Sequence, residues 1–138
     1  MGEPICLLMV DLDNFKQLND TYGHPYGDHV LRTVGHVLRQ QLRRSDRAGR
    51  LGGDEFALVL PGTDLAQVHR VYQRLVDSLS RQPWPHEGPV LSAGAAEAGA
   101  TDTAASLIAR ADAALLAAKR AGKGRLMLDS AVEAGGGE

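Results

Sequence analysis

Two glycines and two carboxylic acids, with the sequence GGDE at positions 52–55, lie between two short runs of strand-forming residues. Glycine supplies the backbone freedom that a tight turn requires, so the pattern predicts a β-hairpin with strands at residues 48–51 and 55–60. A hairpin at the centre of the chain argues against strict alternation of strands and helices. The turn also places two acidic side chains next to each other at one end of the ribbon.

The rest of the chain shows the spacing of apolar residues that helices and strands require. A continuous apolar run near the N-terminus predicts a buried strand, and apolar residues three and four apart predict amphipathic helices. In chain order we predict a strand at 5–10, a short helix at 13–18 capped by Asp13 and ended by residues 19–25, a helix at 27–42, the hairpin, a helix at 65–79 and a strand at 90–96. A last helix, marked by apolar residues from 107 to 118 and ended near Gly122, and a strand at 125–128 follow. This order predicts an α+β fold with a central, mostly antiparallel sheet of about five strands flanked by helices.

The composition is typical of one soluble domain with a core of its own. The chain has 138 residues, of which 43% are hydrophobic and 23% charged, and its net charge is −2. We expect no nucleic-acid partner and no membrane contact, because that charge is small and the arginines between positions 32 and 50 have no aromatic residues among them. The single cysteine, Cys6, excludes an internal disulfide, and the apolar run at 5–10 is too short to cross a membrane. A cytoplasmic protein is expected.

Two pairs of carboxylates are expected at one edge of the sheet. Asp11 and Asp13 follow the first predicted strand, and Asp54 and Glu55 occupy the hairpin turn. If the first strand lies beside the hairpin, these like charges repel unless a cation neutralises them, and oxygen ligands suit Mg²⁺. The turn glycines would let a phosphate approach the backbone. The alternative is structural, because Asp-x-Asp before a helix is often a cap and Gly-Gly-Asp is an ordinary turn.

Residues 50–56, RLGGDEF, resemble the signature of the GGDEF domain of the diguanylate cyclase family. The resemblance covers about residues 5–128 and includes LMVDLDNFK at 8–16, NDTYGH at 19–24, GD at 27–28, AD at 111–112 and AK at 118–119. It implies a cyclase-like or palm-like sheet with a ferredoxin-like core. On this basis residues 1–128 form a GGDEF domain and residues 129–138 a disordered tail.

The resemblance implies an enzyme that joins two GTP molecules into cyclic di-GMP and releases pyrophosphate. By similarity to the family, Asp11, the carbonyl of Leu12, Asp54 and Glu55 would hold Mg²⁺ or Mn²⁺. The implied catalytic residues are Asp54, Glu55 and Lys119, and Asp54 would help to deprotonate the attacking 3′-hydroxyl. Phosphoryl transfer needs such positioning more than covalent help from the protein. Because the product is two-fold symmetric and one half-site holds one GTP, a homodimer is expected.

Further residues are expected to bind GTP, again by similarity to the family. The backbone from residue 13 to 16 and the turn would bind phosphates, and the implied phosphate contacts are Asn14, Phe15, Lys16, Gly53, Lys119 and Lys123. The implied guanine contacts are Asn19 and Asp28. A carboxylate at Asp28 would select guanine, because it accepts hydrogen bonds from N1–H and N2–H₂. Lys119 and Lys123 lie four apart at the end of the last predicted helix, so they should share a face. Taken alone, Asn19 is an ordinary loop residue, Asp28 an ordinary helix N-cap, and the lysines solvated surface.

A second site is expected for the product. Arg43 and Asp46 form an Arg-x-x-Asp motif with five residues between Asp46 and Gly52, which resembles the product-inhibition site of the family. Arg74 resembles a second arginine of that site. Arginine forks suit the phosphates and guanine edges of cyclic di-GMP. Without the resemblance, this motif is a solvated helix end.

The sequence departs from the family pattern at several places. Lys123 stands where an arginine is usual, Gly124 where an asparagine is usual, and Leu116 where a tyrosine is usual. Lysine keeps the charge but loses the bidentate fork, so weaker phosphate binding is expected. Family domains also begin with a helix before the first strand, whereas residues 1–4 alone precede it here. We therefore expect this chain to lack that helix.

Two other functions stay open beside the cyclase. One is a catalytically weak or silent module that binds GTP or cyclic di-GMP; the complete GGDEF sequence at residues 52–56 favours the enzyme over it. The other is a different nucleotide cyclase or a polymerase palm of similar topology. The guanine ligands implied by the resemblance, Asn19 and Asp28, argue against it.

Overall fold

The structure, a computed structural model, describes residues 2–129, and in them it contains five strands and four helices. In chain order these are β1 (Ile5–Leu12), α1 (Phe15–Tyr22), α2 (His24–Gln41), β2 (Arg47–Gly52), β3 (Glu55–Pro61), α3 (Leu65–Ser80), β4 (Leu91–Glu97), α4 (Ala104–Arg120) and β5 (Leu126–Leu128). Each predicted strand and helix is present, and β2 and β3 form the predicted hairpin. Among the described residues, no helix has both the length and the apolar character that crossing a membrane requires.

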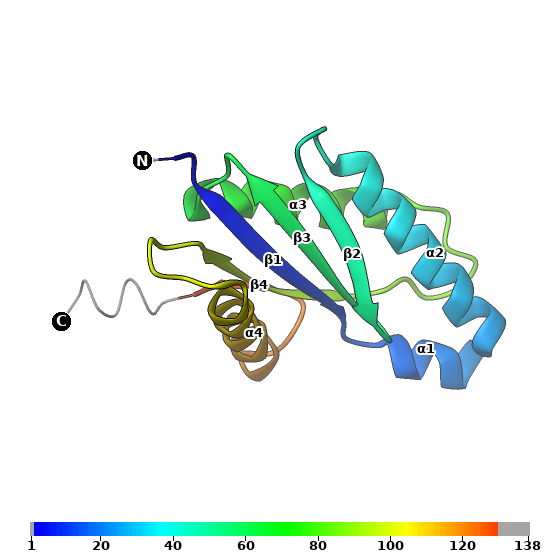
Figure 1. The fold of residues 1–138 in the computed structure, drawn as a ribbon. Helices are drawn as coiled ribbons and strands as arrows, with labels where there is room; N and C mark the ends of the chain where they lie inside the picture. Colours follow the sequence, from blue (N-terminus) through cyan, green and yellow to red (C-terminus); the bar gives the residue numbers. More distant parts are fainter. Residues whose placement is uncertain (1, 130–138) are drawn as a thin grey trace.

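The strands form one sheet in the order β2-β3-β1-β4-β5. The central strand β1 pairs antiparallel with both β3 and β4, whereas β5 pairs parallel with β4. α2 and α3 cover one face of the sheet and α4 covers the other (Figure 1). The predicted α+β class and the mostly antiparallel sheet of five strands are therefore confirmed.

Alternate residues of β1 point into two hydrophobic clusters on opposite faces of the sheet. Leu8 belongs to the larger cluster, which packs against α2 and α3. Met9 belongs to the smaller cluster, which packs against Leu115 and its neighbours on α4. Gly94 lets α4 lie close to β4, because a Cβ at this position would be 2.1 Å from the backbone nitrogen of Leu115. This packing fixes the end of α4 beside the end of β1.

The two helices after β1 are longer than predicted. Asn14, and not Asp13, is the N-cap residue of α1, and the helix continues to Tyr22. Only Gly23 separates α1 from α2, and its φ of 94° is a conformation that glycine adopts without strain. Pro25, which the sequence predicts to interrupt the helices, lies in the first turn of α2, where its missing N–H costs no hydrogen bond.

Two further boundaries also differ from the prediction. α4 begins at Ala104, earlier than predicted, because Thr103 and Ser106 form a capping box. Asp129 is assigned to the tail by the sequence, but it is buried and its N–H donates to the carbonyl of Ala95 at 2.7 Å. The rest of the predicted tail, residues 130–138, lies outside the described residues.

Candidate active site

The turn of the hairpin is shaped by its glycines and leaves its backbone uncovered. Gly53 has a φ of 50°, in the left-handed region, and Gly52 adjoins a bulge that shifts the register between β2 and β3. A Cβ added at either glycine would meet no atom of the described residues within 4 Å. Arg50 closes the turn, because its Nε donates to the Gly53 carbonyl at 2.8 Å. Space is therefore open for a ligand next to Asp54 and Glu55.

The register of the sheet brings the two predicted pairs of acids to one edge. Asp11 of β1 lies opposite Glu55 of β3, and the N–H of Leu12 donates to the Asp54 carbonyl at 3.2 Å. Asp11 is 8% exposed, so its charge is largely removed from water. The structure therefore places Asp11, Leu12, Asp54 and Glu55 together, as expected.

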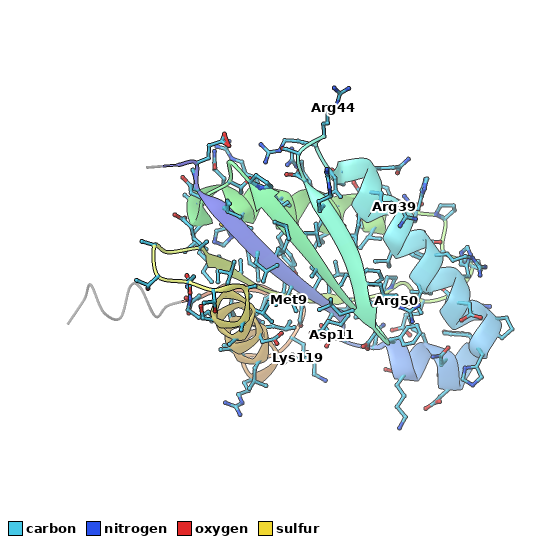
Figure 2. The ribbon with its side chains drawn as sticks, viewed as in Figure 1. Met9, Asp11, Arg39, Arg44, Arg50 and Lys119 are labelled. Carbon is cyan, nitrogen blue, oxygen red and sulfur yellow. The ribbon has the colours of Figure 1, made fainter. Side chains whose placement is uncertain are left out.

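Lys119 is the cation that the chain itself brings to these acids. Its Nζ forms an ion pair with Oδ2 of Asp11, and Figure 2 shows the two residues side by side at the ends of α4 and β1. Burial alone would lower the pKa of Lys119, but the hydrogen bond to Asp11 and the charges of Asp11, Asp54 and Asp13 raise it above its ordinary value. Lys119 therefore stays protonated and offsets part of the carboxylate charge.

Burial and like charges raise the pKa of both turn acids. For Asp54 the pKa is raised first by burial and then by the charge of Asp11. For Glu55 the pKa is raised first by burial and then by the charges of Asp112 and Asp11. A carboxylate with a raised pKa is a better proton acceptor near neutral pH, which suits the deprotonation of a hydroxyl group.

Two buried carboxylate oxygens at this edge, Oδ1 of Asp11 and Oδ1 of Asp13, have no hydrogen-bond partner among the described residues. The other oxygen of Asp13 accepts hydrogen bonds from the Ser92 hydroxyl at 2.7 Å and the Gly124 N–H at 3.0 Å. No three His, Cys, Asp or Glu side chains in residues 2–129 are arranged to hold a metal ion by themselves. The donors still fit Mg²⁺ or Mn²⁺, because such an ion needs few protein carboxylates when water and nucleotide phosphates complete its shell.

The first turn of α1 offers backbone N–H groups to an anion. Phe15 and Lys16 lie in this turn, and Asn14 makes no side-chain cap bond to it. The side chain of Asn14 is instead fixed to the loop before β4, where its Oδ1 accepts from the N–H of Val90 at 3.0 Å. The N–H of Asp13 is not available to a phosphate, because it donates to the Val90 carbonyl at 2.8 Å.

A pocket of about 600 Å³ lies at the start of α1. Its lining combines cations and acids and consists of Asp13, Asn14, Lys16, Gln17, Asp20, Glu87, Val90 and Lys123. The prediction that Lys119 and Lys123 share a helix face is wrong. α4 ends at Arg120, and Lys123 lies in the following turn with a φ of 66°. Lys123 therefore reaches the pocket from the α4–β5 turn, while Lys119 points to Asp11.

The two predicted guanine ligands come from the adjacent helices α1 and α2. Asn19 of α1 packs on Gly27, the residue before Asp28, because a Cβ at Gly27 would lie 1.7 Å from Oδ1 of Asn19. Neither Asn19 nor Asp28 has a side-chain hydrogen bond to another described residue, so both have free polar groups for a ligand. Asp28 lies within α2 and not at its N-cap, which removes the capping alternative.

The predicted product site forms a separate pocket, beyond the end of β2–β3 that is opposite the GGDE turn. Arg43, Asp46 and Arg74 all line this pocket, whose volume is about 240 Å³. Nε and Nη2 of Arg43 donate to the two carboxylate oxygens of Asp46 at 3.2 and 3.1 Å, and Nη2 also donates to the Thr63 hydroxyl at 3.0 Å. The hydrogen bond and the charge of Asp46 raise the pKa of Arg43. The motif is therefore held in one conformation before any ligand binds.

Several residues of these sites were missed by reasoning from the sequence. Ser92 holds Asp13 from a position 79 residues away, a contact that only the pairing of β1 with β4 reveals. Asp112 acts on Glu55 from α4, and the sequence marked it only as part of a motif. Thr63 follows the end of β3, and nothing in its surroundings distinguishes it from an ordinary turn residue.

Comparisons with known proteins show the family to which the chain belongs. Residues 1–125 match the family described as diguanylate cyclase, GGDEF domain. The diguanylate cyclase DgcS of Shewanella oneidensis is 39% identical over 120 residues, which are 86% of this chain and 40% of that protein. The response regulator PleD of Caulobacter vibrioides is 36% identical over 129 residues, which are 88% of this chain and 28% of that protein. The chain thus spans less than half the length of these curated relatives.

Solved structures show the same fold. The GGDEF domain of DgcB from Caulobacter crescentus, in complex with c-di-GMP, superposes with a TM-score of 0.84 at 35% identity and covers 93% of this chain and 79% of that one. The active GGEEF domain of a diguanylate cyclase from Vibrio cholerae superposes with a TM-score of 0.85 at 30% identity and covers 92% of this chain and 83% of that one.

Proposed function

Because this chain belongs to the diguanylate cyclase family with a GGDEF domain, we propose that it forms one half-site of an enzyme that condenses two GTP molecules into cyclic di-GMP. The observation that carries the proposal is the convergence of Asp11 and Glu55, with Lys119 beside them, at an uncovered glycine turn. Acids, a cation and free backbone meet there, where a triphosphate has to be neutralised and positioned.

The substrate-binding groups support a nucleotide with a guanine base. Asn19 and Asp28 would take the guanine edge, since both have free polar groups on neighbouring helices. The N–H groups of Phe15 and Lys16 and the ammonium of Lys123 would bind the phosphates in the pocket at the start of α1. These contacts would hold the α-phosphate near the turn.

In each of two equivalent steps, the 3′-oxygen of one GTP attacks the α-phosphorus of the other. One phosphodiester bond forms, the bond from that phosphorus to the leaving pyrophosphate breaks, and two steps close the ring and release two pyrophosphates. We assign the 3′-hydroxyl proton to a carboxylate oxygen of Asp54, whose pKa is raised by burial. Asp11, the Leu12 carbonyl, Asp54 and Glu55 would hold Mg²⁺ or Mn²⁺. The bound ion would neutralise the negative charge of the phosphates.

The proposed reaction requires two copies of this chain. Each copy offers one guanine site and one GGDE turn, whereas the product contains two equivalent halves. An antiparallel homodimer brings two such half-sites face to face with a two-fold axis between them. Product formation should therefore rise more steeply than linearly with protein concentration.

Inhibition by the product is proposed for the pocket at Arg43. Arg43, Asp46 and Arg74 line it together, and it is separate from the turn, so both sites can be filled at once. The bound c-di-GMP in the DgcB structure shows that a related domain binds this molecule. Since the proposed substrate and product are free nucleotides, we place the reaction in the cytoplasm, with neither nucleic acid nor membrane as a partner.

Incubation with GTP and Mg²⁺, followed by chromatography for cyclic di-GMP and pyrophosphate, tests the proposal. The expected result is two pyrophosphates per cyclic di-GMP, no comparable product from ATP, and about a hundredfold less product, or an even greater loss, from the variant Glu55→Gln. Binding of cyclic di-GMP without any turnover, even at high protein concentration, would instead support a silent sensor module.

A further inference from the structure

The surface between α2 and β2 carries an excess of positive charge. Residues 29–53 contain six arginines but a single acid, Asp46, and this acid is paired with Arg43. Arg32, Arg39 and Arg50 are exposed, and none of them forms an ion pair with another described residue. Figure 2 shows Arg39 on α2 and Arg50 on β2, the two elements that border this surface.

Two adjoining grooves bring these arginines together. The larger has a volume of about 220 Å³ and is lined by Leu31, Arg32, Gly35, Arg39, Arg50 and Phe56. The smaller, of about 50 Å³, shares Gly35, Arg39, Arg50 and Phe56 with it and extends along Ala48 and Gly49 of β2. The guanidinium of Arg39 lies over Gly35, with Nη1 3.5 Å from the place that a Cβ would take. Three guanidinium groups without an ion-pair partner among the described residues thus line the larger groove, and a bound anion would lower their mutual repulsion.

The groove runs beside an unpaired strand edge. β2 is the outermost strand of the sheet, β3 is its only neighbour among the described strands, and all of its residues are exposed. Its outer edge therefore presents N–H and C=O groups that no described strand satisfies. No atom of residues 2–129 lies within 4 Å of a Cβ placed at Gly49, so the face of the sheet is open at the middle of this strand.

We propose that this surface, the α2–β2 groove, is a docking site for an acidic, extended peptide segment of a partner protein. The segment adds to the sheet beside β2, and its backbone satisfies the free edge. Carboxylates on alternate residues of the segment form ion pairs with the guanidinium groups of Arg39 and Arg50, whose planar geometry suits bidentate hydrogen bonding. This interaction does not depend on the proposed catalytic function.

The free strand edge favours a peptide over a nucleic acid. A nucleic acid could neutralise the same arginines, but it has no main-chain N–H and C=O groups in register with a strand. Residues 29–53 contain no Phe, Tyr or Trp, and Phe56, which lines both grooves, is only 4% exposed, so neither offers a stacking surface for bases. An acidic peptide uses both features of the groove, its charge and its edge.

The test uses a short fluorescent peptide of alternating glutamate and valine and the whole chain. We expect saturable binding by fluorescence anisotropy that weakens as salt rises, together with slower hydrogen exchange of the β2 amides. The variant Arg39→Glu should bind about tenfold or more weakly, as expected for loss of a charge-assisted hydrogen bond. Arg120→Glu, an exposed arginine on α4, is the matched control and should bind like the wild type. Circular dichroism confirms that each variant is folded.

Two further probes separate strand addition from simple charge attraction. The same peptide with N-methylated valines keeps its charge but loses N–H donors, so it should bind much more weakly. Equal binding of the methylated and unmethylated peptides overturns strand addition, and binding unaffected by Arg39→Glu overturns the groove. A single-stranded oligonucleotide that binds more tightly than the peptide, or the absence of any peptide binding, also overturns the proposal.

Discussion

The ammonium of Lys119 binds one carboxylate oxygen of Asp11, and the other oxygen of Asp11 is buried without a hydrogen-bond partner among residues 2–129. A residue of α4 thus neutralises the central strand, while half of the carboxylate stays available. The arrangement keeps an acid folded into the sheet edge before any nucleotide arrives. It also ties the stability of the fold to the protonation of Lys119.

Replacing Lys119 by methionine should change the dependence of stability on alkaline pH. The pKa of Lys119 is raised in the folded protein, so the stability it provides is fully present below the unfolded pKa, about 10.4, and is lost as pH rises through the higher folded value. The Tm of the wild type should therefore fall more steeply than that of Lys119→Met above about pH 10. Thermal denaturation in a pH series measures this, with Lys16→Met as an exposed control. Parallel slopes for the wild type and Lys119→Met would show that the ion pair adds no stability.

Removing the charge of a turn acid should stabilise the fold and strongly reduce turnover. The pKa values of Asp54 and Glu55 are raised by burial and by neighbouring acids, so their contribution to stability is fully present only below the unfolded values, about 3.9 and 4.3, and is lost as pH rises through the folded values. At pH 7, Asp54→Asn and Glu55→Gln should therefore have a higher Tm than the wild type. The difference should vanish near pH 3.

Activity and Tm are both measured for the two turn variants, Asp54→Asn and Glu55→Gln. Cyclic di-GMP formation by Glu55→Gln should fall by about a hundredfold or more, the loss typical of a group that acts on transition-state charge. Asp20→Asn, at an exposed acid away from the turn, should leave the Tm unchanged. A Tm that falls in both turn variants would contradict the view that the acids strain the fold.

The acidic edge of the site could be predicted because its signals are local. The GGDE turn and the apolar run that ends at Asp11 each define the end of a strand. The pairing of Asp11 with Glu55 then needed only the assumption that β1 lies beside the hairpin. Where a residue type and its immediate neighbours carry the information, the prediction succeeded.

The parts that could not be predicted depend on contacts between distant segments or on helix ends. Ser92 meets Asp13 only because β4 pairs with β1, and no residue near Ser92 indicates this. The four-residue spacing of Lys119 and Lys123 predicts that both lie on α4, although the helix ends at Arg120 and Lys123 has a positive φ. The sequence also predicts too long a break between α1 and α2. A proline inside a helix interrupts it, whereas a proline in the first turn does not, and the sequence alone does not distinguish these two positions for Pro25.

Adding one methyl group at Gly27 should damage guanine recognition without harming the fold. Glycine within a helix usually costs about 0.5–1 kcal/mol relative to alanine, so Gly27→Ala should be at least as stable as the wild type. The new Cβ would overlap Oδ1 of Asn19, whose amide must move away. We expect the KM for GTP to rise by about tenfold, as for one lost hydrogen bond.

Gly35 provides the matched control for Gly27, because it is a buried glycine of the same helix. A Cβ there would lie 3.5 Å from Nη1 of Arg39, an ordinary contact. Gly35→Ala should therefore show unchanged KM and similar or higher Tm. An equal KM in both variants would remove Asn19 from the guanine site.

Arg74→Ala should relieve product inhibition and leave the fold intact. Arg74 lines the product pocket and is exposed, and its side chain has no hydrogen bond to another described residue, whereas Arg43 is bonded to Asp46 and Thr63. Loss of Arg74 therefore removes a proposed phosphate ligand without breaking a hydrogen bond or ion pair between described residues. We expect cyclic di-GMP to bind about tenfold more weakly by calorimetry, with unchanged Tm. Arg81→Ala, the exposed C-cap residue of α3, should bind the product like the wild type, and equal affinity in both variants would exclude Arg74 from the site.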